Sequence, residues 1–460
     1  MTAEATTASI WDPERRWITI GAVALIFLAA IEALAVTTVM PVISADLDGE
    51  SLYAVAFAAT LATGVIGMVA SGAWSDRSGP RAPLYAAIVL FLVGLVIAGA
   101  APNMGVFLVG RLIQGLGAGG QTVALYVVVA RIYPTPLHGR VFAAFAAAWV
   151  VPSMIGPFLA GAVTQYLHWR WAFLGVAGLV ALAFAMVAVR LRGADLGSGE
   201  VGKDAAQTTG VRLLLATVVA VAAVGIGLAA DLPPGIGWPV AVAAVLVLAF
   251  AIMPLLPRGT LRAATGLPSV VLMRSLIAGA FFAAEAYIPY LLIDRLAFTP
   301  TEAGLAVTAS ALAWSGASAV QGRYGERLGN RRISLIAVLL LLAALTGVLA
   351  VASTTALSPW TVLVVWTLAG AGMGLLYPRL SVLTLAYSSP GNQGFNSSAL
   401  SIADSTGSAV AIAFAGLAFG SIALGPSAFI VVFAFAAGLS ALALLPGLRL
   451  GRAAEDPPSD

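Results

Sequence analysis

The segment GRYGERLGNRRISLIAVLLLLAALTGVLAVA, residues 322–352, decides the fold, because an arginine-rich loop runs directly into an unbroken apolar stretch. As a helix, an apolar stretch of about 20 residues crosses the ~30 Å hydrocarbon core of a bilayer. We therefore predict a membrane-spanning helix over residues 333–352, with the loop at one membrane surface.

Thirteen other stretches share this length and apolar character, so we predict fourteen spans and an all-α polytopic membrane protein. Hydrophobic residues make up 60% of the chain and charged residues 9%, against about 25% charged in soluble domains, which excludes a soluble multidomain protein. The predicted spans are 17–37, 52–73, 84–101, 105–130, 141–163, 171–190, 211–230, 238–256, 269–293, 303–320, 333–352, 359–377, 397–420 and 426–447.

The basic residues predict the orientation of these spans. Of 23 Lys and Arg residues, we assign all but three, Arg274 included, to segments on the side that holds the N-terminus. The exceptions are Arg170 and Arg295 on the opposite side and Arg111 within a span. By the positive-inside rule, we expect both termini to be cytoplasmic. The Ala-, Gly- and Arg-rich, Lys-poor composition suggests a multi-pass protein of a bacterial plasma membrane.

Several functional classes find no support in the sequence. The basic residues are spread over short loops rather than one patch, so we expect no nucleic-acid partner. The chain has no cysteine, which rules out disulfides and thiolate ligands, and metal-site spacings are absent. It also lacks the phosphate-binding loop of an ATPase, so we expect neither cofactor nor metal, and no ATP-driven transport.

One cytoplasmic loop is repeated along the chain. Gly72, Asp76, Arg77, Gly79 and Arg81 recur at the same offsets as Gly322, Glu326, Arg327, Gly329 and Arg331, each set following an inward-running span. This repeat predicts two six-helix bundles with an extra helix pair between them. We expect a first bundle over 1–192, a flexible linker over 193–210, a helix hairpin over 211–262, a second bundle over 263–448 and a tail over 449–460.

Four ionisable residues lie well inside predicted spans: Glu32, Arg111, Glu285 and Asp404. A charge at the centre of a spanning helix costs about 2.5–3.5 kcal/mol on insertion scales, so each of them calls for a functional or structural reason. Counting about 1.5 Å per residue along each helix places Glu32 and Arg111 at similar depths, where they can meet. The pair is either a proton-coupling site or a permanent tie that never titrates.

The neighbours of these residues suggest binding surfaces. Gln114 and Thr122 share a small, polar helix face with Arg111, which either lines a cavity or makes a tight helix contact. Asp404 lies among Ser, Thr and Asn residues, on a face that either lines the pathway as a further proton-coupling group or bonds neighbouring helices. Glu285 is either a second proton site, or a cation-recognition group with aromatic surface for a lipophilic cation, or a side chain that snorkels from an interfacial aromatic belt. The aromatic residues beside Glu285 are Phe281, Phe282, Tyr287 and Tyr290.

Three motifs resemble those of the major facilitator superfamily. Gly72-Ala-Trp-Ser-Asp76-Arg77-Ser-Gly79-Pro-Arg81 resembles its loop signature, and Arg111-Leu-Ile-Gln114-Gly115-Leu-Gly117-Ala-Gly119 resembles its fourth-helix signature. Gly156-Pro157-Phe-Leu-Ala160-Gly161 is similar to the element of its antiporter branch, although Pro152 and Ala160 replace the usual glycines. Glu32-Ala-Leu-Ala-Val-Thr-Thr-Val-Met-Pro41 resembles the start of the 14-helix drug:proton antiporters, with Glu in place of Asp.

The resemblance implies a proton-coupled antiporter, not an enzyme, that exports amphipathic or cationic drugs by alternating access as a monomer, conferring drug resistance through multidrug efflux. It also implies gating roles for the residues of the repeated loops and for Gly156 and Pro157, which otherwise form an inert kink. Two alternatives stay open: a dedicated metabolite exporter or importer of the same superfamily, and a polytopic membrane enzyme or sensor. The gating residues of the loops would be Asp76, Arg77, Arg81, Glu326, Arg327 and Arg331.

Overall fold

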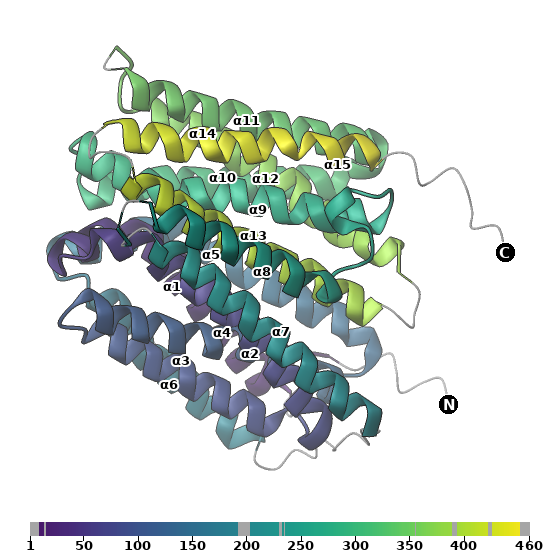
Figure 1. The fold of residues 1–460 in the computed structure, drawn as a ribbon. Helices are drawn as coiled ribbons and strands as arrows, with labels where there is room; N and C mark the ends of the chain where they lie inside the picture. The colour runs from purple at the N-terminus through teal and green to yellow at the C-terminus, as the bar shows by residue number, and fades with distance from the viewer. Residues whose placement is uncertain are drawn as a thin grey trace.

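A computed structural model shows an all-helical chain, and the part of it described here contains no strand (Figure 1). The described residues are 9–12, 15–191, 203–229, 232–233, 235–354, 356–388, 393–421 and 426–450. The main helices are α1 (Arg16–Asp46), α2 (Tyr53–Ser78), α3 (Arg81–Gly99), α4 (Met104–Ile132), α5 (Thr135–Tyr166), α6 (Trp171–Leu191), α7 (Lys203–Leu228), α8 (Gly237–Ile252), α9 (Leu267–Tyr290), α10 (Pro300–Leu328), α11 (Asn330–Ser353), α12 (Thr361–Ala386), α13 (Gln393–Ser421), α14 (Pro426–Leu442) and α15 (Leu444–Arg449).

Fourteen helices in the described ranges are long and apolar enough to cross a membrane, which confirms the predicted fold class. Because that number is even, α1 begins and the last span ends at the same face of the bundle, here called the terminal side. The opposite face, where α1 ends and α2 begins, is called the far side. A membrane imposes this all-helical design, since a helix satisfies its backbone hydrogen bonds within its own segment.

Local sequence signals set several helix ends. The Asn103 side chain accepts a hydrogen bond from the Val106 N–H at 3.0 Å and caps α4. At the start of α10, Thr299 and Glu302 form a capping box, with Pro300 at the first helical position. Caps of this kind satisfy N–H groups that have no partner inside the helix, and they fix where the chain enters each span.

The helices form two halves with equivalent packing. In the first half α2 and α3 pack against α4, and in the second α10 and α11 pack against α12 in the same way. The two groups lie apart in Figure 1, the first coloured purple to blue and the second teal to light green. The repeated loops also have the same conformation, because Gly79 and Gly329 have φ values of 75° and 74°. Only glycine adopts this backbone region at little cost, which explains why both loops contain one there.

The two halves meet chiefly along two interfaces, α5 with α10 and α2 with α13, and α1 adds smaller contacts with α9 and α10. The extra helix α7 packs on both α2 and α13, so it lies across the second interface, while α8 packs chiefly on α7. A Cβ atom on Gly227 of α7 would come within 2.7 Å of Val55 and 3.7 Å of Ala413, one residue from each half. The extra pair is therefore peripheral, but α7 is in contact with both bundles.

Two sequence assignments need correction. Helix α7 begins at Lys203, inside the segment predicted as a linker over 193–210, because Lys, Ala and Gln are good helix formers. Residues 192–202 lie outside the described residues, and so do residues 451–460 of the predicted tail. Arg274, which we assigned to a cytoplasmic segment, lies seven residues beyond the start of α9, within its span.

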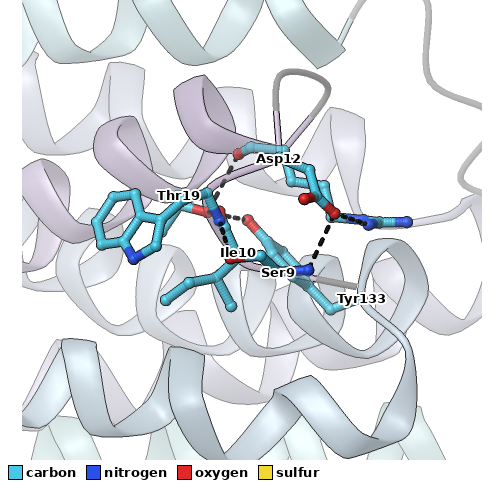
Figure 2. Close-up of polar contacts among 7 residues, drawn as sticks. Ser9, Ile10, Asp12, Thr19 and Tyr133 are labelled. Carbon is cyan, nitrogen blue, oxygen red and sulfur yellow. Dashed lines mark hydrogen bonds and ion pairs between the residues drawn. The ribbon is translucent and has the colours of Figure 1, made fainter. Parts of the chain in front are cut away.

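At the terminal side, a short segment before α1 is held against the end of α4. Figure 2 shows the Thr19 hydroxyl between the Ile10 carbonyl oxygen, at 2.8 Å, and the Tyr133 hydroxyl, at 2.7 Å. Asp12 accepts hydrogen bonds from the Ser9 N–H at 3.0 Å and from the Arg15 guanidinium at 2.9 Å. Burial raises the pKa of the Tyr133 phenol, so the contact between Thr19 and Tyr133 joins two neutral hydroxyls at neutral pH.

Candidate functional site

Glu32 of α1 and Arg111 of α4 form an ion pair inside the first half. Each residue is 4% exposed. The sequence predicted similar depths for the two side chains, and their direct contact confirms that they meet. The pair joins helices that are separated by two intervening spans, so it fixes the position of α1 relative to α4 as well as placing a carboxylate in the membrane.

Other bonds hold Arg111 in place. Its Nη1 donates to Gln114 Oε1 at 2.7 Å, and its Nε donates to the Ala56 carbonyl oxygen of α2 at 3.3 Å. Thr60 of α2 donates in turn to the Arg111 carbonyl oxygen at 3.3 Å. The guanidinium therefore contacts α1, α2 and its own helix, which satisfies several of its donors at a depth where water is scarce.

The polar face predicted beyond Arg111 is largely taken up by helix contacts. Gln114 is fully buried, and its Nε2 has no hydrogen-bond partner among the described residues. The Thr122 hydroxyl, by contrast, donates to the Ala118 carbonyl oxygen of its own helix at 3.0 Å. Gly115 and Gly119 lie against α2 and allow close helix packing. Gln114 is thus the member of this face with an unused donor.

Glu285 of α9 has a different kind of partner. Its Oε2 accepts a hydrogen bond from the Trp366 indole N–H of α12 at 3.0 Å, and it is 5% exposed. No arginine or lysine forms an ion pair with it in the part of the chain that the structure describes. Glu285 is therefore a buried carboxylate with a neutral donor, and the sequence did not single out Trp366.

A column of aromatic rings runs from this carboxylate along the second half. Phe281 stacks on Trp366 with ring centroids 5.3 Å apart, and it contacts Trp314 of α10 edge-on at 5.4 Å. Trp314 contacts Tyr377 of α12 at 5.0 Å. Phe282 joins the column through Phe281 at 5.3 Å. Of the two phenylalanines assigned from sequence, Phe281 lies directly beside the Trp366 that binds Glu285.

Asp404 of α13 lies at the other end of the column, in an ion pair with Arg274. Its Oδ1 accepts from Arg274 Nε at 2.7 Å and from the Tyr377 hydroxyl at 2.7 Å. The Arg274 guanidinium also lies over the Tyr377 ring, with Cζ 3.4 Å from its centroid. The sequence pointed to Asp404 but missed both partners, because Arg274 was counted with the loops and a lone tyrosine carries no signal.

Tyr287 and Tyr290 belong to a separate aromatic cluster at the far side, with Tyr53 of α2 and Phe419 of α13. The ring centroids of Tyr53 and Tyr287 are 5.3 Å apart, and those of Tyr53 and Tyr290 are 4.9 Å apart. The Tyr53 hydroxyl donates to the Ala286 carbonyl oxygen of α9. This cluster joins the two halves, whereas Phe281 points to the column beside Glu285.

Gly156 and Pro157 lie where α5 meets α10 at the far side. A Cβ atom on Gly304 of α10 would come within 2.6 Å of the Pro157 carbonyl oxygen, and one on Gly161 within 2.5 Å of the Pro300 carbonyl oxygen. Thr301 donates to the Gln165 side chain at 2.6 Å across the same interface. Backbone contact of the halves thus depends on Gly161 and Gly304, while Gly156 itself meets only Leu34, at 3.9 Å.

The repeated loops lie at the terminal side, at the ends of α2 and α10. Arg77 and Arg327 occupy the last turns of these helices and are exposed, and Arg331 is exposed in the first turn of α11. Basic residues near a helix C-terminus favour the negative end of its dipole. The Asp76 and Glu326 side chains lie outside the described ones, so the pairing expected for them stays a prediction, as does the role of Arg81.

The equivalent packing of the two halves agrees with a family match that covers most of the chain. The family model described as Major Facilitator Superfamily matches residues 22–283 and 270–460. This chain belongs to the major facilitator superfamily. It is therefore a multi-pass secondary transporter rather than an enzyme, as the resemblance of its motifs had implied.

Solved structures of the superfamily share this fold. An auto-inhibited POT family peptide transporter covers 96% of this chain and 98% of its own, with a TM-score of 0.69 and 16% identity. A POT family transporter in complex with 5-aminolevulinic acid covers 93% and 95%, with a TM-score of 0.68 and 14% identity. At these identities the likeness concerns the fold alone.

Curated relatives match a shorter stretch. An uncharacterized transporter of Schizosaccharomyces pombe is 38% identical over 149 residues, which is 32% of this chain and 25% of that protein. The MFS-type transporter of the acurin A biosynthesis cluster of Aspergillus aculeatus is 35% identical over 147 residues, 32% and 26% of the two chains. An MFS efflux transporter of Aspergillus oryzae is 32% identical over 164 residues, 35% and 30%. This chain thus spans less than a third of the length of each.

Proposed function

We propose that this protein is a proton-coupled antiporter that exports amphipathic or cationic small molecules. One observation carries the proposal: a transporter of this fold holds three carboxylates, Glu32, Glu285 and Asp404, inside its spanning helices. Two of them are paired with arginines, Arg111 and Arg274, and one has a neutral partner. A pump needs groups whose charge is balanced in one state by a protein partner and in another by a proton or a substrate.

The ion pairs provide the coupling step. When Glu32 takes up a proton, its attraction to Arg111 is lost, and the two helices that the pair joins become free to move relative to each other. The same step at Asp404 releases Arg274 of α9. Each pH unit of gradient contributes about 1.4 kcal/mol per proton and each 100 mV about 2.3 kcal/mol per charge, enough to drive export against a modest gradient.

Alternating access follows from the contacts between the halves. At the far side these contacts include two hydrogen bonds and a close backbone contact. They are Tyr53 with Ala286, Thr301 with Gln165, and Gly304 with Pro157. Breaking them opens that side, while the arginine-rich loops at the terminal side act as latches for the opposite state. With cytoplasmic termini, as the basic residues predict, this motion moves a substrate out of a bacterial cell, and one monomer suffices.

One relative favours a narrower substrate range. The acurin A cluster transporter bears the name of a biosynthetic cluster, which supports a dedicated metabolite exporter as the second candidate. The efflux transporter of Aspergillus oryzae supports export as the direction under either reading. The two candidates differ in how many unrelated compounds elicit proton movement.

Everted vesicles provide the test. Vesicles with an acidified lumen receive a panel of lipophilic cations and neutral drugs, and proton release is followed with a pH-sensitive dye. We expect release with several cations from wild-type protein, and loss of that release in Glu32→Gln at equal membrane abundance. A response to a single compound supports the dedicated exporter. Proton movement of wild-type size in Glu32→Gln contradicts its assignment as the proton carrier.

A further inference from the structure

The close glycine contacts fix which residues of the two halves correspond. A Cβ on Gly115 of α4 would come within 2.3 Å of the Thr60 carbonyl oxygen of α2, and one on Gly370 of α12 within 1.9 Å of the Ser310 carbonyl oxygen of α10. Gly119 and Gly374, each four residues further on, meet the carbonyl oxygens of Gly64 and Trp314 at 2.0 Å and 2.2 Å. The spacing is the same on all four helices, so the α4 and α12 registers are aligned.

This alignment places Trp366 where the first half has Arg111, since each lies four residues before the first of these glycines. Both residues bind a glutamate on the first helix of their half: Arg111 binds Glu32 of α1, and Trp366 binds Glu285 of α9. The same register position thus binds a glutamate in both halves. Its side chain is a guanidinium in the first half and a neutral indole in the second.

The exchange leaves an unbalanced site in the second half. A charged Glu32 is neutralised by Arg111. A charged Glu285 would carry a net negative charge, with the Trp366 N–H as its one hydrogen-bond partner among the described residues. A buried charge is costly unless a partner of opposite sign neutralises it. Two cations lie along its own span. Arg295 is ten residues away at the far end, where its guanidinium donates to the Ala352 carbonyl oxygen. Arg274 is eleven residues or about 16 Å away along the axis, and Asp404 already neutralises it.

Among the described residues, the other helices packed on α9 bring no further unpaired cation near Glu285. Glu32 of α1 is the one described charge in the middle of a neighbouring span besides Asp404, and it is paired. The described arginines of the remaining neighbours lie toward helix ends or in the flanking turns. They are Arg262, Arg295, Arg323, Arg327, Arg331, Arg332, Arg379 and Arg449.

The rings around Glu285 suit a cation with apolar substituents. Phe281 stacks on Trp366 and also contacts Trp314 edge-on. Trp314 is less buried than the other two rings. Aromatic faces attract cations, most strongly when both are desolvated, and Trp gives the strongest attraction. In the first half, Gly64 stands at the register position of Trp314, so that half offers no such surface.

We propose that Glu285, Trp366, Phe281 and Trp314 form a binding site for a lipophilic monocation, in which Trp366 replaces the internal arginine of the first half. The site rests on the proposed function, because it names the substrate class that the antiporter takes. One carboxylate balances one charge, so the site prefers monocations to neutral compounds of the same shape and rejects anions. The cation takes the place of the indole N–H as the partner of Glu285.

Equilibrium binding to the purified chain in detergent tests the site without transport. The probes are tetraphenylphosphonium, neutral triphenylphosphine oxide and the anion tetraphenylborate, which share aromatic substituents and differ in charge. We expect tetraphenylphosphonium to bind more tightly than both other probes. Glu285→Gln removes the counter-charge and should weaken its binding at least about tenfold, which is 1.4 kcal/mol. Glu50→Gln, an exposed carboxylate of the far side, is the matched control with unchanged binding.

Trp366→Arg recreates the ion pair of the first half and is the sharpest variant. It should abolish tetraphenylphosphonium binding, because the introduced guanidinium would neutralise Glu285, while Trp360→Arg at an exposed loop tryptophan leaves binding intact. Trp366→Phe keeps a ring but removes the N–H bound to Glu285, so tetraphenylphosphonium binding should be retained. Loss of binding in Trp366→Arg but not in Trp366→Phe then shows that the added charge, and not a folding defect at this position, abolishes binding. If Trp366→Arg does not give folded protein, the other two variants test the site: binding should be weakened in Glu285→Gln and retained in Trp366→Phe.

The results separate this site from the proposed function. Equal binding of the three probes, or wild-type affinity in Glu285→Gln, overturns the site even when vesicles show substrate-driven proton release. Charge-selective binding that is weakened by Glu285→Gln and abolished by Trp366→Arg supports the site even when no proton movement accompanies it, in which case the antiport proposal fails alone.

Discussion

The ion pair between Glu32 and Arg111 gives a quantitative stability prediction. Both residues are 4% exposed, so removing one partner leaves the other as an uncompensated buried charge. Breaking such a pair costs about 3–5 kcal/mol. Arg111→Met also removes the donor to Gln114 and Ala56, and we place it in this range. Glu32→Gln leaves those two bonds in place and should fall at the lower end of this range, about 3 kcal/mol.

The double variant distinguishes a true pair from two separate effects. With neither charge present, no unpaired ion remains, and the double variant should cost no more than Arg111→Met alone, against about 6–8 kcal/mol if the single costs simply added. The free energy of unfolding is measured in mixed micelles by titrating a denaturing detergent into dodecyl maltoside. Additive costs within about 0.5 kcal/mol would show that the pair contributes no coupling and refute the reasoning.

Three further predictions concern packing, the second ion pair and the far-side interface. Gly119→Leu should destabilise the protein by about 1–3 kcal/mol or more, because its side chain would meet the Gly64 backbone. The control Gly178→Leu, on an open face of α6, should leave stability unchanged, and thermal unfolding measures both variants. Tyr377→Phe removes a hydrogen bond to Asp404 and should cost about 1.5–3 kcal/mol in the same assay; an unchanged Tm counts against this bond. Because the chain has no cysteine, the double variant Gln165→Cys, Thr301→Cys forms a disulfide across the two halves without competing thiols. This cross-link should stop transport, and a reductant should restore it. Transport by the cross-linked protein would contradict an opening of the halves at this interface.

Much of the fold could be predicted from sequence because a bilayer makes it a local property. A run of about 20 apolar residues spans as a helix whatever its neighbours are, since no other open structure satisfies its backbone in hydrocarbon. The repeated loops then indicated the two halves. Depth along a helix follows from counting residues, so the contact of Glu32 with Arg111 was also within reach of the sequence.

Sequence symmetry held one more signal than we used. The glycines at 115, 117 and 119 recur at 370, 372 and 374, and aligning them would have placed Trp366 opposite Arg111. Asp404 was recognisable as a buried charge, but its partner Arg274 was not. An arginine seven residues inside a helix can serve the loop or the core, and only the position of α13 against α9 decides which.

What the sequence determined by itself was therefore the number of spans, their order, the repeat and the similar depth of Glu32 and Arg111. Only the tertiary structure decided which side chains face one another: that Tyr287 meets Tyr53 across the halves, that Phe281 stacks on Trp366, and that Glu285 has an indole as its partner. Membrane helices are apolar around most of their circumference, so hydrophobicity does not reveal which face packs where. Small residues, ring shapes and hydrogen bonds set that rotation, and they act between helices far apart in the chain.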